Sequence, residues 1–163
     1  MAWRAADAGD DVALDEVTDL AAVWRGKAEL SLEATQPGTA FAQVTNAAWP
    51  EPRFAAYAAR HSGRLTHAVA VGAAAAFHGL PLRASCLAWL TAFAANIVSA
   101  GVRLVPLGQT DGQIATAALL PAIEAATDAA LAVTDADSIG ASAIAIDLSS
   151  MRHETQYTRL FRS

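Results

Sequence analysis

The sequence has little cysteine, few aromatic residues and little charge, and each scarcity excludes a class of protein. Its 163 residues include one cysteine, Cys86, so an internal disulfide or a cysteine-rich metal cluster cannot form. Charged residues make up 17% of the chain and hydrophobic residues 54%, the opposite of the balance that keeps a chain disordered. Acidic residues outnumber basic ones 16 to 11, which argues against binding nucleic acid through its phosphates.

Alanine is the most frequent of the hydrophobic residues, and it predicts the fold class. Alanine is the best helix former and is poor in strands, and the β-branched residues are too scattered to build a large sheet. We therefore expect an all-α fold, a single-domain bundle of about six to seven helices over residues 1–163. Apolar spacing and Pro or Gly breaks place these helices at 12–34, 39–47, 54–61, 65–78, 82–105, 112–134 and 139–154.

The longest uncharged stretch runs for 19 residues from Ala84 to Val102 and is long enough to cross a membrane. On a helical wheel Ser85, Asn96, Ser99 and Arg103 lie within about 60° of one another, while Leu, Phe and Ile side chains gather on the other side. A helix in lipid has no reason to keep such a polar stripe. The pattern predicts a buried, two-faced core helix, and a membrane-embedded module is the alternative.

Catalytic and metal-binding signatures are absent from the sequence. It lacks GxSxG, HExxH and GxGxxG, and the candidate phosphate loop Gly108–Gly112 lacks the following Lys-Ser/Thr. The histidine spacings do not bring metal ligands together, and the acidic start of the chain is typical of a solvated face. We expect no catalytic, cofactor or metal site. The alternative is a small helical metal-binding protein or hydrolase that uses histidines, namely His61, His67, His78 or His153.

The segment from Val102 to Gln113 carries more polar groups than a connection between two helices requires. Thr110 or Asp111 can cap the following helix, but the Arg and the two Gln side chains then have no structural task. Guanidinium and amide groups beside a rigid turn suit recognition of another chain. The segment is therefore either an internal polar clamp or a partner site, with candidate residues Arg103, Pro106, Gly108, Gln109, Asp111 and Gln113.

The chain ends in a tail that combines arginine with aromatic and aliphatic residues. A free terminus normally frays, whereas this composition is typical of interface hot spots. The tail either packs on its own bundle or binds a partner. The partner-binding tail spans 155–163, and the candidate residues around it are His153, Glu154, Tyr157, Arg159, Leu160, Phe161, Arg162 and Ser163.

The sequence VRLVPLGQTDGQ, followed by an apolar helix and a terminal MRHETQYTRLFRS, closely resembles the urease accessory protein UreF family. Both motifs occur in the order and relative spacing of that family, and the resemblance runs through the last hundred residues. Members of the family usually begin with a further helical segment that contains Ser-Pro, Pro-Val-Gly and Phe-Ser-Tyr motifs. This chain has no such stretch and resembles the family from a point past it.

The resemblance implies an all-α cytoplasmic protein with no catalytic activity and no cofactor of its own. It implies binding to UreD (also called UreH), joint recruitment of the GTPase UreG, and GTP-dependent nickel insertion into apo-urease. It also implies a homodimer within a larger complex, with nickel and GTP handled by the partner proteins and no role for nucleic acid or membrane. By the same resemblance, the tail orders when UreD binds, and the turn from Arg103 to Gln113 belongs to or supports the UreG-binding surface.

Overall fold

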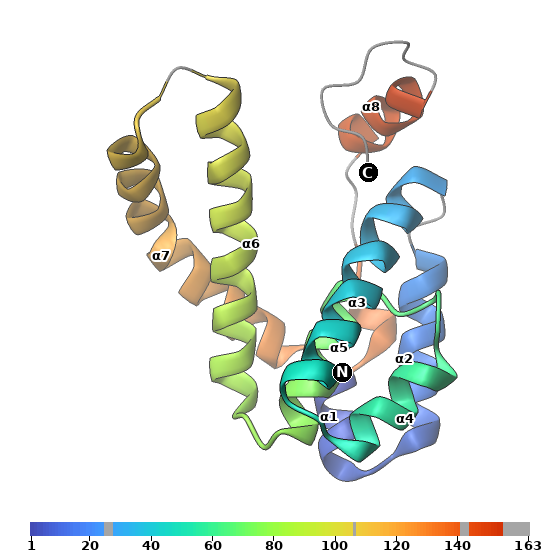
Figure 1. The fold of residues 1–163 in the computed structure, drawn as a ribbon. Coiled ribbons are helices and arrows are strands. Elements are labelled where there is room, and N and C mark those ends of the chain that lie inside the picture. Colours follow the sequence, from blue (N-terminus) through green and yellow to red (C-terminus); the bar gives the residue numbers. More distant parts are fainter. Residues whose placement is uncertain (25–27, 106, 141–143, 155–163) are drawn as a thin grey trace. The chain divides into compact units, whose positions relative to one another are not determined.

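A computed structural model describes residues 1–24, 28–105, 107–140 and 144–154. Every regular element in these residues is a helix (Figure 1), which confirms the predicted all-α class. The described residues form two compact units, one from the described parts of residues 1–79 and 135–163 and one from those of residues 80–134. A single domain over 1–163 and a separate tail at 155–163 remain predictions.

Unit 1 contains most of the helices. Their bounds are α1 (Ala2–Ala8), α2 (Asp11–Trp24), α3 (Ala28–Ala48), α4 (Pro52–Arg60), α5 (His67–Phe77), a short 3₁₀ helix (Ala136–Ser138) and α8 (Ile144–Glu154). The connection Trp49–Glu51 lies in the predicted break between the helices at 39–47 and 54–61, and Pro52 begins α4. Glu51 ends this loop and caps α4, because its Oε2 accepts a hydrogen bond from the backbone N–H of Phe54 at 2.6 Å.

Helix α5 is the centre of unit 1, and α1 and α3 both pack against it. Its buried residues are mainly alanines, and Ala70 and Ala73 have no exposed surface. Small side chains let neighbouring helices approach closely, so the alanine-rich composition suits this arrangement. Phe54 and Tyr57 from α4 and Leu14 from α2 supply the bulk of the same core.

Helix α3 differs from the prediction because it runs unbroken through Pro37. The sequence predicts a stop or kink at residues 36–38, since proline disfavours helix in the residue before it. Glu33 and Pro37 are both exposed, so water can bond the Glu33 carbonyl that proline leaves without a donor. Gly38 is buried against the backbone that leads into α5, and this packing favours the continuous helix.

Helix α1 is an element that the sequence reading missed. It has seven residues and no side-chain cap at its start, so it carries little of the usual helix signal. It ends at Gly9, whose φ of 70° is a left-handed conformation that glycine adopts without strain. Three alanines of this short helix are buried in the core of unit 1.

Unit 2 is a helical hairpin of α6 (Leu82–Leu104) and α7 (Gln109–Ala132). Near the turn, Gly112 is buried, and a Cβ there would lie 3.0 Å from Val102 Cγ2. Further along the hairpin, Arg83 and Asp128 form an exposed ion pair at 3.1 Å. Both helices begin and end close to the predicted positions.

The prediction that α6 is a buried core helix is wrong. No residue of α6 is buried, and Phe93, Ile97 and Leu104 of its apolar stripe are each more than half exposed. In α7, Ile123 is buried, whereas Leu119 and Leu120 are exposed. Helical periodicity identifies an apolar face without showing that anything covers it. Both helices are long and apolar enough to cross a membrane, a test that core helices of soluble proteins also pass.

Candidate partner-binding surfaces

The turn of the hairpin uses Asp111 to start α7. The helix begins at Gln109, and Asp111 Oδ2 accepts a hydrogen bond from the backbone N–H of Gly108 at 2.9 Å. A carboxylate in the first turn also interacts favourably with the helix dipole. Asp111 therefore has a structural role at the start of α7. Pro106, another predicted residue of the turn, lies outside the described residues.

The remaining polar residues of the turn are exposed. Arg103 lies in the last turn of α6, and its Nε donates to the Ser99 carbonyl of the same helix at 3.2 Å. Gln109 and Gln113 are four residues apart in α7 and therefore lie on one face of it. Within the described residues, neither glutamine side chain has a hydrogen-bond partner. The turn thus presents amide groups and one guanidinium that can bond to another molecule.

The predicted tail residues lie largely outside the part of the chain that the structure describes. His153 and Glu154 fall at the end of α8, where the helical backbone is described and these side chains are not. Tyr157, Arg159, Leu160, Phe161, Arg162 and Ser163 lie beyond the described residues. Their role stays a prediction from the sequence.

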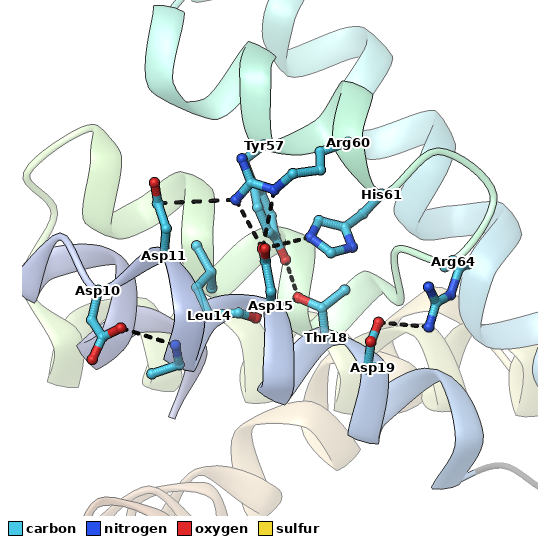
Figure 2. A network of polar contacts seen from close by, with 11 residues as sticks. Asp10, Asp11, Leu14, Asp15, Thr18, Asp19, Tyr57, Arg60, His61 and Arg64 are labelled. Carbon is cyan, nitrogen blue, oxygen red and sulfur yellow. Dashed lines mark hydrogen bonds and ion pairs between the residues drawn. The ribbon is translucent and has the colours of Figure 1, made fainter.

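A second polar cluster, between α2 and α4, was not predicted from the sequence (Figure 2). Asp15 Oδ1 accepts hydrogen bonds from Arg60 at 2.8 Å and 3.2 Å and pairs with His61 Nε2 at 2.7 Å. The hydrogen bond from Arg60 is the largest reason why the pKa of Asp15 lies below its ordinary value, and His61 acts in the same direction. Arg64 and Asp19 form a further ion pair at 2.6 Å.

A buried hydroxyl pair lies beneath these ion pairs. The Thr18 and Tyr57 hydroxyls are 2.5 Å apart, and Thr18 also donates to the Leu14 carbonyl at 2.7 Å. Burial raises the pKa of Tyr57 to about 12, so the phenol stays protonated. The cluster joins α2 to α4 through contacts that are satisfied internally, which makes it a structural clamp and not a reactive centre.

The helical spacing of this cluster was present in the sequence. Asp15 and Asp19 are one turn apart, and Arg60 and Arg64 are one turn apart. The two pairs follow the same order along both segments, because Asp15 pairs with Arg60 and Asp19 pairs with Arg64, which lies just beyond the end of α4. That signal becomes specific only when α2 and α4 are known to be neighbours.

The pH dependence of the unfolding free energy tests the role of Asp15 in this clamp. A carboxyl whose pKa is lower in the folded state contributes stability that is complete above its unfolded pKa and is lost as pH falls through the folded pKa. The Asp15→Asn variant should therefore show a shallower fall in unfolding free energy than the wild type between about pH 5 and pH 2. Guanidinium denaturation followed by circular dichroism measures this slope. Glu16→Gln, an exposed change on the same helix, is the control, and equal slopes for Asp15→Asn and wild type would contradict the assignment.

The histidines do not gather into a metal site in the described part of the chain. His61 is bonded to Asp15, His67 packs edge-on against Phe41, and His78 ends α5 on the surface. Burial lowers the pKa of His67, which keeps its ring neutral. Among the described residues, no group of three or more His, Cys, Asp or Glu side chains could hold a metal ion.

Comparison with known proteins identifies the family. The family model described as UreF matches residues 1–120, which include the turn of the hairpin. The chain is 56% identical over 161 residues to a protein of Granulibacter bethesdensis and 48% identical over 163 residues to one of Rhodopseudomonas palustris (strain HaA2). It is also 48% identical over 162 residues to one of Xanthobacter autotrophicus, and all three are named urease accessory protein UreF.

These alignments cover 99%, 100% and 99% of this chain and 68%, 68% and 66% of the respective relatives. The chain therefore spans about two thirds of the length of the relatives it matches. The family model covers most of the chain, and the identities are near one half over its whole length. Together these findings establish the family. The chain belongs to the UreF family of urease accessory proteins, and its role is an accessory one in urease maturation.

Proposed function

We propose that this protein is a non-catalytic assembly factor that, together with UreD (UreH), recruits the GTPase UreG and supports GTP-dependent nickel insertion into apo-urease. It acts in the cytoplasm as a homodimer within a larger complex and modulates the partner GTPase. Nickel is cargo in this process, and the protein needs no cofactor of its own because the partners handle nickel and GTP.

The observation that supports this proposal is the exposed polar turn at the end of the α6–α7 hairpin. Asp111 is used for the helix start, while Gln109, Gln113 and Arg103 face solvent. Exposed amide and guanidinium groups on a rigid turn can bond to the surface of a partner without first breaking contacts between side chains. The turn lies within the segment that the UreF family model matches.

Replacing Arg103 tests this role directly. If Arg103 is a hot spot for UreG recruitment, Arg103→Ala should weaken that recruitment by on the order of 2 kcal/mol, or about thirtyfold. The measurement is titration of UreG onto the complex of this protein with UreD, followed by assay of urease activity in cells.

Arg83→Ala is the matched control for this experiment. Arg83 lies at the opposite end of α6 and forms an exposed ion pair with Asp128, so its removal should change stability by less than about 1 kcal/mol and leave recruitment unchanged. Equal recruitment by Arg103→Ala, Arg83→Ala and wild type would exclude the turn as a contact. Normal urease activation in cells that lack this protein altogether would overturn the assembly function itself.

A further inference from the structure

We draw no further inference here: the strongest candidate, the exposed apolar face of helix α6 that carries Phe93, Ile97 and Leu104, supports no proposal because nothing in the described part of the structure shows what covers it.

Discussion

Gly38→Ala should destabilise the protein by about 3 kcal/mol or more, because the helix crossing leaves no room for a side chain at this position. A Cβ on Gly38 would lie 2.0 Å from the Leu65 carbonyl oxygen and 2.7 Å from the carbonyl carbon of Thr66. These are backbone atoms, so no side-chain rotation relieves the overlap. Helix α3 would have to move away from the start of α5, and the core residues around that crossing would lose contact.

Two other glycines serve as controls for this substitution. Gly72 lies in α5, where a Cβ would make ordinary contacts at 3.5 Å, and Gly101 lies in α6 with nothing within 4 Å. Alanine at these helical positions should be neutral or stabilise by up to about 1 kcal/mol, because alanine favours helix over glycine. Thermal and guanidinium unfolding followed by circular dichroism compare the three variants. If Gly38→Ala matches Gly72→Ala in stability, the close crossing of α3 and α5 is not present.

The sequence was sufficient to predict the helices that depend on local signals. Helices α4 and α6 are bounded by Pro or Gly, α7 begins after Gly108, and α6 and α7 have long apolar periodicity, so their positions agree with the structure within a few residues. Helix α3 shows the limit of such signals. Proline at position 37 argues locally for a break, but the packing of Gly38 on the backbone before α5 depends on a contact about 27 residues away along the chain.

Burial was harder to predict than secondary structure. An apolar stripe marks a face that another surface can cover, and in α6 this face stays largely exposed while the alanines of α5 form the core. The Asp15 cluster was missed for a related reason. Each of its charges looks like a solvated residue on its own segment, and the pairs form only because the end of α4 folds against α2.

The candidate partner-binding turn, in contrast, could be predicted from the sequence. The turn could be recognised from the sequence because a capping residue explains Asp111 and leaves Arg103, Gln109 and Gln113 without a structural task. The structure places those three residues in solvent, as a partner site requires.

Deletion of Arg159–Ser163 should abolish copurification with UreG in the presence of UreD while leaving the folded protein intact. This prediction depends on the proposed function and on the composition of the tail, in which Leu160 and Phe161 stand between arginines. Apolar anchors flanked by guanidinium groups are typical of the few residues that dominate binding energy. If the tail binds a partner and does not pack on its own bundle, helical content and melting temperature should change little.

The deletion separates a partner-binding tail from one that packs on its own bundle. Circular dichroism and thermal melting of the deleted protein come first, because a loss of helix content or a much lower melting temperature would show that the tail stabilises the fold. Copurification with tagged UreD and measurement of urease activity then follow. A segment that becomes ordered on binding loses conformational entropy, and the contacts of its apolar anchors must offset this cost. The double variant Leu160→Ala, Phe161→Ala removes these contacts and should therefore weaken recruitment strongly. Normal urease activation by the folded deletion variant would exclude the tail from recruitment and leave the turn as the remaining candidate.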